Sequence, residues 1–129
     1  MQLKLIIAKE NSEFKDAWKI YNKTFGRKRT FYEFEERFCH AGNKIYFVII
    51  NNAKIGFVMI SSRNELGYFI LPKFQNKGIG NQAIKQLMMK EKREYYWALV
   101  DFDNKESKKF AQSIGMVPSS LVYSVDSSK

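Results

Sequence analysis

Three short apolar segments that follow one another closely in the middle of the chain constrain its fold most strongly. They cover residues 45–50, 55–61 and 65–71, and each is rich in β-branched and aromatic side chains. Asparagine-containing turns of a few residues separate them. Segments of this length and spacing are typical of strands that pair as consecutive hairpins. We therefore expect an antiparallel meander at the centre of the fold.

Helical periodicity precedes this meander. A strand at 3–8 leads to a helix that begins near Asn11 and to a second helix that begins at Thr30, where Glu33 completes a capping-box pattern. The apolar face of the first helix is formed by Phe14, Trp18, Tyr21 and Phe25. Their spacing of three and four residues is the helical one. The chain therefore begins with one strand and two helices.

The segments after the meander alternate between helix and strand. We expect a helix at 80–93, a buried strand at 95–102, a helix capped by Asn104 and a short strand at 121–125. The helix at 80–93 joins its two neighbouring strands in a βαβ crossover, so these strands should be parallel. The predicted fold class is α/β with a mixed sheet, in the order β-α-α-β-β-β-α-β-α-β.

Length and composition indicate one globular, cytoplasmic domain over residues 1–129. Apolar residues make up 45% of the chain, which is enough for a hydrophobic core. Cys39 is the one cysteine, so no internal disulfide framework is expected and a reducing compartment suits the chain. The apolar run at 5–8 is too short for a signal peptide or a membrane span. We expect no membrane partner.

The charge is strongly basic but dispersed. With 22 basic and 13 acidic residues, the formal net charge is +9, which favours a polyanionic partner such as nucleic acid or a phosphorylated cofactor. Basic and acidic residues alternate along the chain rather than forming blocks. Interspersed charge is typical of an ordinary solvated surface. Nucleic acid is therefore the less favoured partner.

The segment Gln75-Asn76-Lys77-Gly78-Ile79-Gly80 lies between a predicted strand and a predicted helix. Two glycines there allow backbone N–H groups to turn toward one point, and the following helix adds its N-terminal N–H groups and its dipole. Such an arrangement can receive a pyrophosphate. A plain turn that requires two glycines is the competing interpretation, and the two glycines alone would favour it.

A dinucleotide-binding fingerprint is a second competitor. Gly78, Gly80 and Ala83 fit its spacing, and Asp101 lies near the position of a ribose-binding acid. In that fold, however, the first glycine follows its strand almost directly, whereas here the strand ends near Leu71. The chain after Ala83 is also too short for the remaining strands of such a sheet. The phosphate loop of nucleotide triphosphatases is excluded because no Gly-Lys-Ser/Thr is present.

Residues 65–80 resemble the acetyl-CoA motif of the GNAT superfamily of N-acetyltransferases, whose core is Gln/Arg-x-x-Gly-x-Gly/Ala. The run 103–107, with Phe110 and Gly115-Met116, resembles a second GNAT motif, and the order of elements is the GNAT order. The resemblance implies a mostly antiparallel mixed sheet with a parallel, splayed βαβ strand pair at its centre and helices on both faces. It also implies acetyl-CoA as cofactor, with no metal.

The same resemblance implies roles for particular residues. The backbone of the strand at Tyr68, Phe69 and Ile70 would bind the pantetheine arm as an added strand does, and one N–H would face the thioester oxygen. The pyrophosphate would lie on Gln75, Asn76, Lys77, Gly78, Ile79, Gly80 and Asn81. The side chain of Asn104 would reach the cofactor from the second splayed strand.

The sequence offers several candidates for the catalytic acid and base. The family tyrosine that protonates the leaving thiolate corresponds to Ala111, which predicts weak activity or a relocated acid such as Tyr123. Glu65, at the start of the central strand, is the candidate base, and an ordinary solvated glutamate is the alternative. Glu35, Glu36, Asp101 and His40 are weaker candidates for the base. A Cys39–His40 dyad is not expected, because adjacent helical residues do not face each other.

The first hypothesis is therefore an N-acetyltransferase that moves an acetyl group from acetyl-CoA to a primary amine of a small molecule or protein, by direct attack in a ternary complex. The alternative is a non-catalytic module with a GNAT fold that binds acyl-CoA or a protein, and Ala111 favours it. A homodimer is compatible with either hypothesis. The acceptor cannot be read from the sequence, because one fold serves many acceptors.

Overall fold

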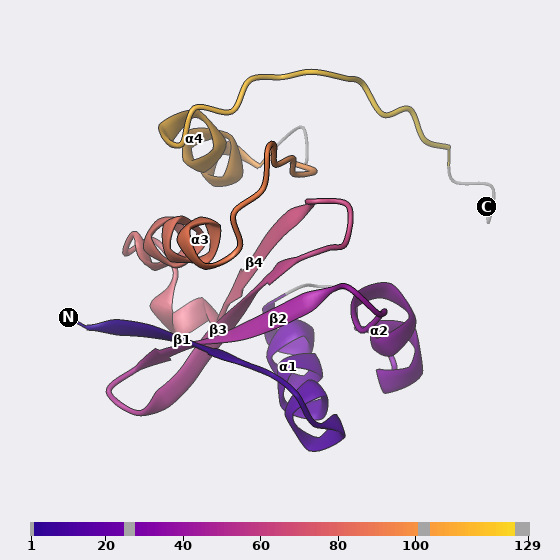
Figure 1. Ribbon diagram of the computed structural model, residues 1–129, viewed down its shortest axis with the longest axis vertical. Helices are drawn as coiled ribbons and strands as arrows, with labels where there is room; N and C mark the ends of the chain where they lie inside the picture. The colour runs from indigo at the N-terminus through magenta and orange to yellow at the C-terminus, as the bar shows by residue number, and fades with distance from the viewer. Residues whose placement is uncertain (1, 25–27, 101–103, 126–129) are drawn as a thin grey trace. The chain divides into compact units, whose positions relative to one another are not determined.

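The computed structural model describes residues 2–24, 28–100 and 104–125 (Figure 1). The chain forms two compact units, Met1–Leu99 and Val100–Lys129. The first unit holds the sheet and the helices α1, α2 and α3, and the second holds α4. The single domain expected over 1–129 stays a prediction.

The first unit is built on a four-stranded antiparallel sheet in the order β1-β2-β3-β4. The strands are β1 (Leu3–Ile7), β2 (Lys44–Ile50), β3 (Ala53–Ile60) and β4 (Leu66–Ile70). Asn51 and Asn52, between β2 and β3, both have positive φ angles of 52° and 64°. Tight hairpins require positive φ at both central residues, and asparagine tolerates it well. The predicted antiparallel meander is confirmed.

Helices cover both faces of this sheet (Figure 1). The helices α1 (Asn11–Thr24) and α2 (Phe31–Phe38) pack on one face, and α3 (Ile79–Lys90) packs on the other. The capping box predicted at the start of α2 is present: Thr30 Oγ1 accepts from Glu33 N, and Glu33 Oε1 accepts from Thr30 N. Phe25, expected on the first helix, lies outside the described residues.

An aromatic cluster fixes β4 against the first two helices. Phe57 of β3 and Phe69 of β4 stack with ring centroids 4.7 Å apart, and Tyr21 of α1 lies 5.5 Å from Phe69. Phe34 and Phe38 of α2 complete the cluster. On the opposite face, α3 contributes the buried residues Ile79, Ala83, Ile84 and Leu87. Because β4 is packed on both faces, its backbone is held firmly.

The buried strand predicted at 95–102 is not formed over the described residues 95–100. Trp97 makes an isolated parallel bridge to Glu65, with Leu66 N donating to Trp97 O and Trp97 N to Asn64 O. Tyr95 and Leu99 are each 61% exposed, so the segment lacks the buried face that holds a strand in register. The prediction of a strand was wrong here, but the parallel direction was correct.

The second unit contains α4 (Lys105–Ser113), and its start at Asn104 matches the prediction. The strand predicted at 121–125 is absent. Tyr123 and Val125 are each 89% exposed, and Leu121 is 80% exposed. A strand needs a neighbouring strand and one buried face to be stable in water. The apolar character of 121–125 therefore did not suffice to form one.

Candidate active site

The loop between β4 and α3 has the geometry of an anion receptor. A short 3-10 turn at Pro72–Phe74 follows β4, and Gln75 Nε2 then donates to Ile70 O at 2.9 Å, which ties the loop back to the strand. Asn76 and Gly78 have positive φ angles of 63° and 76°. A helix leaves its first N–H groups without intrahelical acceptors, and the N-cap residue of α3, Gly78, has no side chain to accept from them. Such a helix start is a favourable place for phosphate.

The two glycines of the loop serve different physical purposes. Gly78 has a left-handed backbone, and a Cβ atom added to it would meet nothing within 4 Å. At Gly80, in contrast, an added Cβ would lie 2.8 Å from two ring carbons of Tyr68. Gly80 therefore allows close contact between the start of α3 and β4. The sequence reasoning assigned both glycines to turning N–H groups, and it missed this packing role.

Positive charge flanks the loop. The ammonium groups of Lys73 and Lys77 lie 5.8 and 5.9 Å from the ring centroid of Phe74. Both ammonium groups therefore lie near Phe74, at the start of the loop. Asn81 lies in the first turn of α3, and its Oδ1 atom is buried. The loop therefore carries two lysines and a left-handed glycine at the start of a helix, and its role toward a pyrophosphate stays a prediction.

Glu65 lies at the start of β4, and its backbone is well held. Glu65 N donates to Ser61 Oγ at 3.0 Å, and Ser61 N donates to Glu65 O at 2.9 Å. Its carboxylate lies 3.5 Å from Arg37 Nη2, at the end of α2. The Glu65 side chain is 15% exposed and that of Arg37 is 43% exposed. The ion pair to Arg37 was not foreseen, because residues on α2 and β4 are brought together only by the fold.

The other candidates on α2 do not gather into a site. Burial, and secondarily the charge of Glu35, raises the pKa of the Cys39 thiol to about 11, so the thiol stays protonated at neutral pH. Glu35, Glu36 and His40 are exposed. No group of three or more potential metal-ligating side chains occurs in the described ranges. Asp101 lies outside them.

The predicted residues of the second unit are Asn104, Ala111 and Tyr123. Asn104 Oδ1 accepts a hydrogen bond from Ser107 N at 3.0 Å, so this side chain caps α4. Ala111 lies on the same helix. Tyr123 is 89% exposed in the extended segment that follows. The roles of these three residues toward the loop at 75–81 remain predictions.

Sequence reasoning missed a buried carboxylate at the end of α3. Glu91 is 7% exposed, and it accepts from Lys44 Nζ at 3.1 Å, from Arg93 Nη1 at 3.2 Å and from Tyr46 Oη. Burial would raise the pKa of Glu91, but the hydrogen bonds from Tyr46, Lys44 and Arg93 hold it below its usual value. Glu91 follows the buried Leu87 by one helical turn, which was the available signal.

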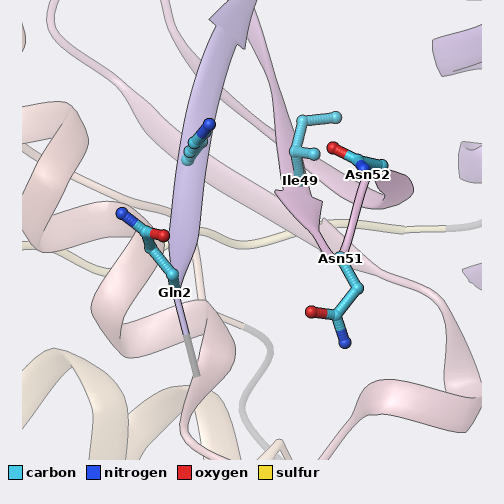
Figure 2. Close-up of a pocket in the computed structure, with 5 residues that line it drawn as sticks. Gln2, Ile49, Asn51 and Asn52 are labelled. Carbon is cyan, nitrogen blue, oxygen red and sulfur yellow. The ribbon is translucent and has the colours of Figure 1, made fainter.

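A small polar hollow lies elsewhere in the first unit. Figure 2 shows Gln2 at the start of β1, Ile49 on β2, and Asn51 and Asn52 in the turn that follows, and Lys4 also lines the hollow. It contains none of the predicted site residues. None of the helices in the described part of the chain combines the length and apolar character needed to span a bilayer.

Several solved structures of acetyltransferases have a similar fold. AAC(6')-Iy in complex with the bisubstrate analogue CoA-S-monomethyl-acetylneamine has a TM-score of 0.75 at 14% identity, with 98% of each chain covered. The ribosomal-protein-S18-alanine N-acetyltransferase from Escherichia coli has a TM-score of 0.73 at 16% identity, covering 88% of this chain and 77% of that one. The aminoglycoside 6'-N-acetyltransferase AAC(6')-Ih from Acinetobacter baumannii gives 0.72 at 14% identity and 99% coverage of both.

At the sequence level, no curated protein matches the chain significantly. The model of the Acetyltransferase (GNAT) family, however, matches residues 11–116. This match includes α1, the sheet from β2 onward, the loop at 75–81 and α4. The resemblance found in the sequence is thereby confirmed, and the chain belongs to the GNAT family of acetyltransferases.

Proposed function

We propose that this protein is an N-acetyltransferase that moves an acetyl group from acetyl-CoA to a primary amine. One observation carries the proposal: in a GNAT family member, β4 leads through the short turn at Pro72–Phe74 to the left-handed Gly78, where α3 begins. Acetyl-CoA, expected from the sequence, is the cofactor of this family. Two of the similar structures contain CoA or a CoA-based bisubstrate analogue.

The loop residues would hold the diphosphate. Backbone N–H groups from Asn76 to Asn81 and the ammonium groups of Lys73 and Lys77 supply the positive ends of dipoles and charges that a pyrophosphate requires. Gln75 supports the loop through its hydrogen bond to Ile70 O. The backbone of Tyr68, Phe69 and Ile70 would bind the pantetheine arm alongside β4.

Acetyl-CoA supplies the thioester, and in the transfer a C–N bond to the amine forms while the C–S bond breaks. Glu65 would take the proton that the attacking ammonium must lose. A backbone N–H of β4 would stabilise the negative oxygen that develops on the acetyl group. The proton for the departing sulfur would come from Tyr123 or from water, because Ala111 offers none.

Ala111 also keeps a second candidate function open. A GNAT fold without the usual acid can serve as a binding module for acyl-CoA or for a protein partner. The acceptor, in turn, can be a small molecule or a protein, since the structural relatives include aminoglycoside and ribosomal-protein acetyltransferases.

The test is release of free CoA thiol from acetyl-CoA in the presence of a panel of primary amines, alongside thermal unfolding with CoA. An acetyltransferase should release thiol only with an amine present, and CoA should raise the unfolding temperature. Stabilisation by CoA without thiol release would favour the binding module. If millimolar CoA neither raises the unfolding temperature nor leads to thiol release, the proposal is overturned.

A further inference from the structure

We propose that the acceptor is a zwitterion, namely a small α-amino acid or a similar amine with an acidic group one or two carbons away, and that Arg37 selects it. This inference rests on the proposed acetyl transfer with Glu65 as the base. It adds a substrate class and a residue that determines specificity.

The Glu65 carboxylate is only partly satisfied by its surroundings. Its side chain is 15% exposed, and Arg37 is the one cation within 4 Å of it among the described residues. Their separation of 3.5 Å is long for a charge-assisted hydrogen bond, which is normally near 2.8 Å. The carboxylate can therefore accept a further, closer donor. An ammonium group of an acceptor is such a donor.

Arg37 cannot easily leave when an acceptor arrives. Its guanidinium carbon lies 4.9 Å from the ring centroid of Phe38, in a cation–π contact. Phe38 is 5% exposed and belongs to the aromatic cluster beneath α2. The guanidinium is nevertheless accessible, because the Arg37 side chain is 43% exposed. A fixed and accessible guanidinium favours a carboxylate, which it can bind through two N–H groups.

A fixed cation beside the base discriminates among amines. An acceptor with an ammonium group alone would be repelled by Arg37 as it approaches Glu65, and a polycation would be repelled more strongly, also by the net charge of +9. An α-amino acid carries its ammonium and carboxylate a few ångströms apart. It can place the ammonium on Glu65 and the carboxylate on Arg37 at once, so that each charge faces its opposite.

The overall transfer is balanced. The ammonium gives one proton to Glu65, and the neutral amine that results attacks the acetyl carbon. A C–N bond forms, and the thiolate leaves with the electron pair of the C–S bond. The thiolate then takes up one proton, and the amide nitrogen releases its second proton to solvent. The product is an N-acetyl amino acid whose carboxylate still faces Arg37.

The experiment compares each α-amino acid with its own amide, for example leucine with leucinamide and phenylalanine with phenylalaninamide. Rates are corrected for the fraction of free amine, because the amides are weaker bases. We expect kcat/KM to favour the amino acids by about tenfold or more, the effect of one well-placed charge-assisted contact. Arg37→Gln should reduce that ratio to near one, and Arg37→Lys should preserve part of it.

Lys85→Gln is the matched control, because it removes the same single charge from an exposed position on α3. The ratio should not change in this variant. A wild-type protein that uses amides as well as acids would overturn the inference. So would an Arg37→Gln variant that loses activity equally on both members of each pair, since that result indicates a purely structural role.

A binding measurement distinguishes failure of this inference from failure of the proposed acetyl transfer. If thiol release fails with every amine, calorimetric titration of leucine into the protein saturated with CoA still tests the site. Binding of leucine but not leucinamide, lost in Arg37→Gln, would support the zwitterion site in a protein that does not turn over. If neither leucine nor phenylalanine binds or reacts, the inference is wrong.

Discussion

Two substitutions at Gly78 can test whether the loop binds a negatively charged group. Its φ of 76° is tolerated by asparagine and aspartate better than by other side chains, and an added Cβ meets open space. Gly78→Asn and Gly78→Asp should therefore fold alike. They differ in one charge placed where the pyrophosphate is expected.

We expect Gly78→Asp to bind CoA at least about tenfold more weakly than Gly78→Asn, because two like charges would face each other. Isothermal titration calorimetry measures the two affinities, and circular dichroism confirms equal folding. Equal affinities in the two folded variants would mean that no phosphate lies near Gly78.

Substitutions of Glu91 can show how much its charge and its hydrogen bonds contribute to the free energy of unfolding. Glu91→Gln keeps an oxygen for Tyr46 but loses the charge that faces Lys44 and Arg93, whereas Glu91→Leu loses both. Because Lys44 and Arg93 are partly exposed, we expect Glu91→Gln to lower the free energy of unfolding by about 1 kcal/mol, and Glu91→Leu by about 3 kcal/mol. Denaturant titration at pH 7 measures both. A more stable Glu91→Leu would show that the polar cluster costs more than it contributes.

The hydroxyl group of Tyr46, which donates to Glu91, should make the free energy of unfolding depend on pH. Burial, followed by the hydrogen bond to Glu91, raises its pKa from 10.0 to about 12. Between these values the unfolded chain releases a proton that the native protein retains, so the free energy of unfolding should fall as pH rises from about 10 to about 12. Tyr46→Phe should lack this part of the decline. Parallel declines in the two proteins would contradict the assignment.

At the scale of whole elements, the contact between Gly80 and Tyr68 joins α3 to β4. Gly80→Ala would place a methyl group 2.8 Å from the tyrosine ring. We expect a loss of about 1–3 kcal/mol in the free energy of unfolding, the usual cost of overpacking. In a Tyr68→Ala background the same change should cost much less. A double-mutant cycle measures the difference, and additive effects would mean that the contact is not energetically coupled.

The elements that local signals define were predictable. The Thr30–Glu33 capping box, the asparagine turn at 51–52 and the Asn104 cap each depend on residues a few positions apart. The segment at 95–100 was wrongly predicted to be a buried strand, because what covers its side chains depends on residues that are distant in sequence. Apolar alternation specifies a face but not the presence of a neighbour to cover it. The ion pair of Arg37 with Glu65 escaped prediction for the same reason.

At the scale of the whole molecule, the residues assigned to the proposed function belong to both units of the chain. The loop at 75–81 and Glu65 belong to residues 1–99, whereas Ala111 and Tyr123 belong to residues 100–129. The loop at 75–81 could be predicted as a connection from strand to helix, because it is a continuous stretch of backbone. The proton donor stays a prediction, because no continuous stretch of sequence specifies it.

The absence of the usual tyrosine acid at Ala111 predicts slow turnover. A general acid typically contributes about 10²–10⁴-fold to a rate, so a GNAT enzyme with Ala111 should turn over slowly rather than not at all. Ala111→Tyr should raise the rate of thiol release in single-turnover experiments without changing CoA affinity.

Tyr123→Phe is the matched variant: if it lowers turnover while CoA affinity stays intact, Tyr123 supplies the proton. If Tyr123→Phe has no effect and Ala111→Tyr accelerates release, water protonates the sulfur in the natural protein. If neither the natural protein nor Ala111→Tyr releases thiol with any amine between pH 6 and 9, while both still bind CoA, the fold serves as a binding module.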